Sequence, residues 1–455
     1  MRSWEPDSFE EQDIVIKQPK MINLSPPMII SLGFLVLITL GTGLLMLPIS
    51  ATQATPLLSA LFTATSAVTV TGLGVLDTGT HFTVFGQVVI ALLIQAGGLG
   101  FMTFAVVAAS MLGAKIGINQ QRVAQEAFNQ TSLENLTQIA KAVLWYSLII
   151  EGIGILLLTL IWQSEFGWGE AAYRAFFYTI SAFNNAGFAL DASSLMPYVS
   201  NVGVNLVISA LFMIGGIGFV VLMDLRQKKT WSKLSTNTRL VLTTTFFLNI
   251  SAFLLIWLLE ARNPNTLGAL SWSDQALAAW FQAVSPRTAG FNTLAMDQLT
   301  NASTFLTMFL MFIGAGSLST ASGIKVGTFA ILLVATYSVL RQQDEVTVFK
   351  RTIPLQQVMK AMALMVVAAF LIFLGIFVLD ITEKASFLDI SFEVVSALGT
   401  VGLSRGLTPK LSEAGQLMII FLMIAGRLGP LTLAYSFAVP KHDLIRYPET
   451  RVQIG

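Results

Sequence analysis

Long apolar runs separated by short polar segments dominate the pattern of hydrophobic and polar residues along the chain. A helix rises 1.5 Å per residue, so about 20 apolar residues are needed to cross the hydrocarbon core of a bilayer. Eight runs reach this length, and the pattern therefore predicts eight membrane-spanning helices. They lie near residues 29–48, 81–111, 137–162, 200–223, 237–259, 302–337, 357–379 and 413–438.

A shorter apolar segment and a glycine turn lie within each successive pair of spans. These segments, near 56–67, 169–183, 274–284 and 387–397, are too short to cross a bilayer. The turns read AVTVTGL, AFNNAGF, PRTAGFN and ALGTVGL, and their matching residues Gly72, Gly187, Gly290 and Gly402 are 115, 103 and 112 residues apart. A nearly constant period of this size indicates tandem repeats.

Each repeat consists of a span, a half-helix, a glycine turn and a second span. The predicted units are a cytoplasmic N-terminal segment (1–28), four repeats (29–111, 137–223, 237–337 and 357–438) and a cytoplasmic C-terminal tail (439–455). A segment that enters the membrane and returns leaves both flanking spans on the same side. All four repeats then share one orientation, which favours fourfold pseudosymmetry around an axis normal to the membrane.

Composition supports an all-α integral membrane protein. Of the 455 residues, 54% are hydrophobic and only 11% are charged, and the mean hydropathy is +0.73. The absence of cysteine excludes disulfides, and a net charge of +1 without a basic face argues against nucleic acid as a partner. No Ser/His, paired-aspartate or HExxH pattern occurs at span depth, so an enzyme is not expected.

Lysine and arginine set the predicted orientation. Eighteen of them fall on the side of the N-terminus and six on the opposite side, so both termini are expected in the cytoplasm and the four turns outside. The densest basic cluster lies after the fourth span, where contact with anionic membrane lipids or docking of a regulatory subunit would explain it. It comprises Arg226, Lys228, Lys229, Lys233 and Arg239.

The four turns together predict a cation site. Non-helical backbone at membrane depth must be buried in protein or line a watery cavity, and a ring of carbonyl oxygens can replace the hydration shell of potassium. A simpler reading is that each glycine caps a short helix. The predicted potassium-binding carbonyls belong to Val70, Thr71, Gly72, Asn185, Ala186, Gly187, Thr288, Ala289, Gly290, Thr400, Val401 and Gly402.

The segments SAFNNAGF (181–188), SPRTAGFN (285–292) and IAGRLGPLTL (424–433) resemble motifs of the Trk/Ktr/HKT superfamily of potassium transporters, most closely the KtrB type of membrane subunit. The resemblance implies potassium uptake in a bacterial inner membrane, a potassium-channel-like fold and no covalent cofactor. It also implies a homodimer seated on a KtrA-like octameric ring of cytosolic nucleotide-binding regulatory subunits, with stimulation by sodium. Sodium-selective relatives carry serine in the first turn, so Gly72 favours potassium.

The sixth apolar run is too long for one span. Residues 304–337 would extend about 51 Å as one helix, and their centre is small and polar. We expect a broken helix, although small residues can also serve close helix packing. The resemblance implies a gating loop at about 314–328 opposite Arg427, which otherwise would extend to the cytoplasmic surface. The gate residues are Gly314, Ala315, Gly316, Ser317, Ser319, Thr320, Lys325 and Arg427.

Two further residues are expected to support the turns. Arg287 should point away from the pore axis and bind backbone carbonyls or an acid, and Asn184 should either approach the pore or brace its turn. Two alternative functions stay open: a sodium-conducting or sodium-coupled transporter of the same superfamily, and a solute symporter of unrelated fold. Symporters of that second kind usually place broken helices in two inverted halves, not in four parallel repeats.

Overall fold

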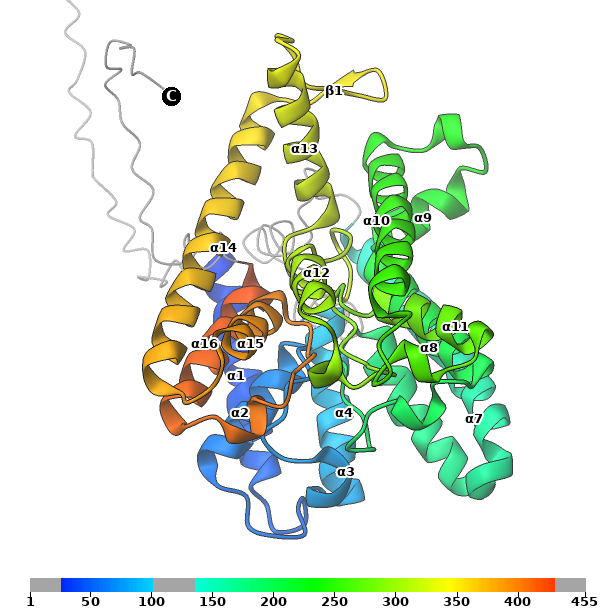
Figure 1. The fold of residues 1–455 in the computed structure, drawn as a ribbon, viewed down its shortest axis with the longest axis vertical. Coiled ribbons are helices and arrows are strands. Elements are labelled where there is room, and N and C mark those ends of the chain that lie inside the picture. The colour runs from blue at the N-terminus through cyan, green and yellow to red at the C-terminus, as the bar shows by residue number, and fades with distance from the viewer. Residues whose placement is uncertain (1–25, 101–135, 430–455) are drawn as a thin grey trace, which may run out of the picture.

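The computed structural model describes residues 26–100 and 136–429, which form helices and one small hairpin (Figure 1). The first half contains α1 (Pro26–Leu45), α2 (Leu57–Val68), α3 (Thr78–His81), α4 (Val84–Leu99), α7 (Leu136–Phe183), α8 (Val202–Ile217) and α9 (Phe219–Gln227). The second half contains α10 (Thr236–Glu260), α11 (Trp272–Val284), α12 (Asn301–Phe312), α13 (Val326–Leu340), β1 (Thr347–Val348), β2 (Arg351–Thr352), α14 (Leu355–Thr382), α15 (Phe387–Gly399) and α16 (Glu413–Leu428).

Within the described residues, α7, α10 and α14 are each long and apolar enough to cross a membrane. The pair α8 and α9 makes a fourth candidate span if its two parts are counted together, but they meet at 90°. The span expected near 200–223 is therefore bent and does not form one straight helix. The bend falls at Gly218, whose φ of 106° ends one helix and begins the next.

Other boundaries follow the apolar pattern closely. The expected span and half-helix at 137–162 and 169–183 are joined in α7, where Gly167 leaves the helical conformation with φ 75°. The long run at 302–337 is broken, with α12 and α13 separated by residues 313–325. The later part of the span expected at 81–111 and the last part of that at 413–438 lie outside the described residues.

The third and fourth half-helices, α11 and α15, begin with polar caps. Ser271 accepts a hydrogen bond from the backbone N–H of Asp274 in α11, and Ser386 accepts one from Asp389 in α15. A serine followed three residues later by an acid is typical of a helix start, because both side chains satisfy free backbone donors. Every residue from Ile390 to Gly399 is buried, so α15 is surrounded by protein on all sides.

The helices pack in a closed order. In each repeat, the helix that follows the glycine turn contacts the helix of the next repeat that carries the half-helix. Thus α4 packs on α7, α8 on α11, α12 on α15, and α16 on α2. This cyclic arrangement brings the ends of the four half-helices toward one centre. The hairpin of β1 and β2 lies at the end of the molecule opposite α3 (Figure 1).

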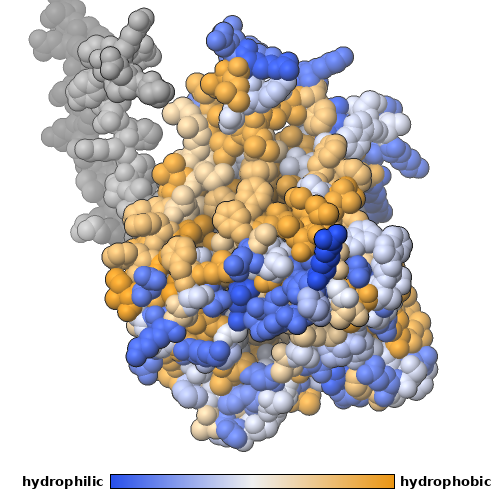
Figure 2. Space-filling model, viewed as in Figure 1, coloured by the Kyte–Doolittle hydropathy of each residue, from blue (hydrophilic) through white to orange (hydrophobic). Residues whose placement is uncertain are grey.

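The outer surface of α14 is apolar. Val366, Phe370, Phe373 and Phe377 recur at helical spacing and are 67%, 61%, 66% and 55% exposed. Figure 2 shows hydrophobic surface over α13 and α14, with hydrophilic residues gathered around the β1–β2 hairpin above it. An apolar face of this kind suits contact with lipid.

Candidate functional site

The four glycine turns share one backbone conformation. In each turn the glycine has a positive φ, between 69° and 92°, and so does the residue two positions before it. Those earlier residues are Val70, Asn185, Thr288 and Thr400, with φ of 58°, 60°, 71° and 48°. The residue between them is not left-handed, so the backbone alternates in hand, which allows successive carbonyls to project from one side.

The turns contact one another in a closed ring. The space beside each glycine is occupied by the carbonyl oxygen that precedes the glycine of the neighbouring turn, where a Cβ atom would have to lie. Gly72 faces Ala186, Gly187 faces Ala289, Gly290 faces Val401, and Gly402 faces Thr71. Carbonyl oxygens from all four turns therefore converge, which is the arrangement that coordinates an alkali cation through main-chain oxygen.

A single open hollow lies over this ring. Its volume is about 750 Å³, and it is lined by residues of all four turns, including each of the four glycines. Asp77, Asp191 and Asp297 also line it, together with Arg405 and Lys410. Asp191 accepts hydrogen bonds from Arg174 at 3.0 and 3.1 Å, so this carboxylate is already paired.

Serine hydroxyls brace the turns from the half-helices. Ser181 donates to the carbonyl of Phe188 at 2.7 Å, and Ser285 donates to that of Phe291, the equivalent residue in the third turn. In the first turn, Ser66 instead accepts from the N–H of Gly72 at 3.0 Å. The hydroxyl is thus used in more than one way to hold a similar backbone.

The loop at 313–325 folds back on itself beneath the turns. Its ends meet as a parallel bridge between Ile313 and Ile324, and the N–H of Gly314 donates to the Ile324 carbonyl at 2.8 Å. The loop also pairs with the bend between α8 and α9, since the N–H of Phe219 donates to Leu318 at 2.8 Å. It contacts the second turn through Thr320, whose hydroxyl lies 2.9 Å from Asn185 Oδ1.

Arg427 ties this loop to the end of α4. Its Nη1 donates to the Thr320 carbonyl at 2.5 Å and to Ser322 Oγ at 2.9 Å. Its Nη2 donates to the carbonyls of Gly98, at 3.0 Å, and Gly97. Carbonyls at a helix C-terminus carry partial negative charge, so the guanidinium is well placed between them and the loop.

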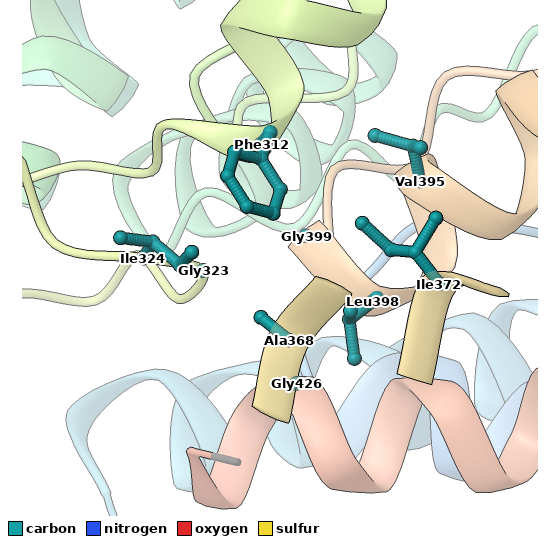
Figure 3. A pocket seen from close by; sticks show the side chains of 9 residues that line it. All are labelled: Phe312, Gly323, Ile324, Ala368, Ile372, Val395, Leu398, Gly399 and Gly426. Atoms are coloured by element: carbon teal, nitrogen blue, oxygen red, sulfur yellow. The ribbon is translucent and has the colours of Figure 1, made fainter. Parts of the chain in front are cut away.

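The side of the loop that faces α14 and α15 is apolar. Figure 3 shows Phe312 and Ile324 beside Ala368 and Leu398, around a small hollow that Gly399 and Gly426 also line. Lys325 lies at the end of the loop and donates to the Ala321 carbonyl at 2.6 Å. The loop is therefore held by hydrogen bonds on one side and by apolar contacts on the other.

The gate residues predicted from the sequence thus come together, but one support residue differs from expectation. Arg287 is buried, with 7% exposure, yet its Nε and Nη1 atoms have no hydrogen-bond partner among the described residues. The expected pairing with carbonyls or an acid is wrong for these atoms. Arg287 is absent from the lining of the hollow above the turns, in agreement with a position away from the axis.

Sequence reasoning missed a polar group behind the second turn. Of the two positions expected for Asn184, the structure shows the one behind its turn, where it contacts Gln95 and Glu151. An ionisable residue within a predicted span is a signal of function, and Glu151 carried that signal. The bend at Gly218 also had a signal, the segment GGIG at 215–218.

A helical protein with long apolar helices and four convergent turns of this kind belongs to the class of membrane transport proteins. The TrkH family, described as cation transport proteins, matches residues 25–447 of the chain. The chain belongs to this family, which is a family of transporters. The fold agrees: the crystal structure of the potassium transporter TrkH from Vibrio parahaemolyticus matches with a TM-score of 0.75 at 20% identity, over 93% of this chain and 87% of that one.

Relatives of higher identity cover nearly the whole chain. The Ktr system potassium uptake protein B of Bacillus subtilis is 48% identical over 98% of this chain and 99% of its own length. The protein of the same name from Vibrio alginolyticus is 44% identical over 94% and 95%. The potassium/sodium uptake protein NtpJ of Enterococcus hirae is 37% identical over 97% and 100%.

Proposed function

We propose that the chain takes up potassium across the cell membrane through a selectivity filter built from the four turns. The observation that carries this proposal is the closed ring in which each glycine faces a carbonyl oxygen of the next turn. Main-chain oxygens in such a ring replace the water around a potassium ion, and the half-helices direct the negative ends of their dipoles toward it. The relatives named potassium uptake protein B support this cargo.

In this proposal the four repeats keep the boundaries given above, with eight spans and four re-entrant turns around one axis. Both termini are cytoplasmic, in a bacterial inner membrane. The membrane potential drives the ion inward. The name "Ktr system" of the relatives supports a cytosolic regulatory partner, for which we propose a nucleotide-binding ring beneath a homodimer of this chain, with sodium as a stimulating ion.

The loop at 313–325 and Arg427 form the proposed gate. The loop lies against the second turn, where Thr320 approaches Asn185, and Arg427 fixes the loop through the Thr320 carbonyl and Ser322. Loss of these hydrogen bonds would free the loop to leave the path. Deletion of 314–320 should therefore raise ion flux, and Arg427→Ala should raise it less, because the loop keeps its other contacts.

The test uses purified chain in liposomes, with flux of potassium, rubidium and sodium compared. We expect potassium and rubidium to enter faster than sodium, and Arg427→Ala to increase the flux of both. The exposed Arg262 supplies the matched control, since Arg262→Ala removes the same charge far from the loop. Flux no greater than in empty liposomes, for the parent chain and both gate variants, would refute the proposal.

A second candidate is transport of both potassium and sodium. The Enterococcus relative carries the name potassium/sodium uptake protein, and its similarity covers 97% of this chain. The same liposome experiment separates the two candidates. Equal rates for sodium and potassium would favour the second, whereas strong preference for potassium would favour the first.

A further inference from the structure

Glu151 is a buried acid inside an apolar helix that the ion pathway described above does not use. It lies in α7 within the sequence SLIIEGIGI and is 6% exposed. An ionisable side chain at such a depth is costly and normally has a partner and a role. None of the ion pairs among the described residues includes Glu151.

Its partners are two side-chain amides. Gln95 of α4 donates through Nε2 to Glu151 Oε2 at 3.1 Å, and Asn184 approaches Oε1 through Nδ2 at 3.3 Å. Asn184 Nδ2 also donates to Gln95 Oε1 at 2.6 Å. The three side chains therefore form a triangle of hydrogen bonds between α4 and the two halves of α7.

This triangle reaches the second turn through Asn184. Asn184 immediately precedes Asn185, Ala186 and Gly187, and its Nδ2 lies 3.0 Å from the carbonyl of Ile180 in the same half-helix. On its other side it packs tightly on Gly98, where an added Cβ would overlap Asn184 Oδ1. Any shift of the Asn184 side chain would thus be transmitted to the backbone of the turn.

The described helices that pack on α7 bring no competing charge to this carboxyl group. The helices α4 and α8, which pack on α7, contain no ionisable residue. Arg427 approaches the same part of α4 but donates to the carbonyls of Gly97 and Gly98. Tyr146 lies five residues earlier on α7 and accepts a hydrogen bond from Arg226 of α9. Among the described residues, the hydrogen bonds of Glu151 are therefore those with the two amides.

We infer that Glu151 is a positioning residue for the second turn, which it holds through Gln95 and Asn184 so that the turn's carbonyls discriminate between potassium and sodium. This inference rests on the proposed function. It extends that function from the oxygens that would touch the ion to a side chain behind them that does not.

Glutamine should replace Glu151 without loss. The glutamine amide oxygen can still accept from Gln95 Nε2, and Asn184 Nδ2 keeps its hydrogen bonds to Gln95 Oε1 and to the Ile180 carbonyl. Alanine instead leaves the amides of Gln95 and Asn184 unsatisfied and opens space behind the turn. The pair of variants therefore separates the hydrogen-bond geometry from the negative charge.

The experiment compares Glu151→Ala, Glu151→Gln and Gln95→Ala in liposomes, with the ratio of potassium to sodium flux as the readout. Thermal unfolding in detergent checks that each variant is folded. We expect the ratio to fall about tenfold in Glu151→Ala, equivalent to about 1.4 kcal/mol, and to stay within about twofold of the parent in Glu151→Gln. The exposed Glu165 of the same helix provides the control Glu165→Ala, which should leave the ratio unchanged.

An unchanged ratio in folded Glu151→Ala would overturn the inference, and so would a loss in Glu151→Gln as large as in the alanine variant. If Glu151→Ala does not fold, Gln95→Ala tests the inference in its place. This variant removes the hydrogen bonds that α4 makes to Glu151 and Asn184, and it should also lower the ratio of potassium to sodium flux. A parent chain with no selective flux would refute the proposed function instead, and that result is visible before any variant is compared.

Discussion

The second and third turns have the same backbone but different support at the equivalent position behind it. Three residues before the glycine, the second turn has Asn184 and the third has Arg287. Asn184 contacts Gln95, Glu151 and Ile180, whereas Arg287 is buried with Nε and Nη1 unpaired among the described residues. The repeat therefore preserves the shape that faces the centre, and each turn has acquired its own means of holding that shape.

The third turn has a further support from the segment after the fourth turn. Arg405, which follows the fourth turn, donates to the carbonyl of Met296 at 2.9 Å and to Thr304 Oγ1 at 3.0 Å. Both partners belong to the segment that leaves the third turn. The second turn also contacts the gate loop through Thr320. Disturbance of the second turn should thus affect both gating and discrimination, and disturbance of the third turn should affect discrimination alone.

The largest effect is expected where the two turns are alike. Gly187→Ser and Gly290→Ser should both reduce the preference for potassium over sodium, by about tenfold or more. A residue with a side chain costs about 1–2 kcal/mol in a left-handed conformation, and a Cβ at Gly187 would lie 2.8 Å from the Gly290 Cα. Flux ratios in liposomes measure the change. Gly43→Ser is the control, because a Cβ at Gly43 meets nothing within 4 Å.

The filter assignment would be wrong if both variants kept the parent's selectivity. An unequal result would sharpen the comparison in a different way. If Gly290→Ser reduced the preference for potassium much less than Gly187→Ser, the backbone of the third turn would have to adjust to a side chain more easily than the backbone of the second.

The next largest effect is on the free energy of unfolding, which should differ between substitutions of Asn184 and of Arg287. Asn184→Leu should destabilise the protein by about 1–3 kcal/mol, because Gln95 and Glu151 lose a buried hydrogen-bond donor. Arg287→Met should be neutral or stabilising, since a buried guanidinium whose Nε and Nη1 have no partner among the described residues is exchanged for an apolar chain. Thermal unfolding of the two purified variants in one detergent measures the difference. Equal destabilisation by both substitutions would show that Arg287 has a partner after all.

Local pattern could predict the turns but not their support. The sequence itself shows the repeat period, which is set by Gly72, Gly187, Gly290 and Gly402. It also shows the length and the small residues of the broken run at 302–337. The contact of Glu151 with Gln95 joins residues 56 positions apart in different repeats, and no periodicity encodes such a distance. The same limit explains Arg287, whose charge suggested a partner that its Nε and Nη1 do not find within residues 26–100 and 136–429.

The bend between α8 and α9 shows a second limit. Composition gave an uninterrupted apolar run at 200–223, because hydropathy measures burial from water and not the direction of the backbone. Gly218 turns the chain by 90°, and the freed backbone groups pair with the gate loop, as in the hydrogen bond from Phe219 to Leu318. Two irregular segments in different repeats thus satisfy one another, which a reading of either segment alone could not show.

The smallest effect concerns the external support of the third turn. Asp389 lies in the first turn of α15 and pairs with Arg405 Nε at 2.8 Å. Burial alone would raise the pKa of Asp389, but hydrogen bonds from Arg405 and Ser386 and the nearby charge outweigh it, so its pKa lies below the ordinary value of 3.8. A lowered pKa means that the carboxylate stabilises the fold above pH 3.8, and that this contribution is lost as the pH falls through the lowered value.

Asp389→Asn should therefore lower stability at pH 7 by less than about 1 kcal/mol, since the pair is partly exposed, and the difference from the parent should shrink below pH 3.8. Thermal unfolding at pH 7, 5 and 3.5 measures it, with Asp344→Asn, at an exposed position before the β1–β2 hairpin, as the control. A difference that stays constant across this range would mean that Asp389 acts by shape and not by charge. The contribution of Arg405 to the third turn would then depend on its contacts with Met296, Asp297 and Thr304.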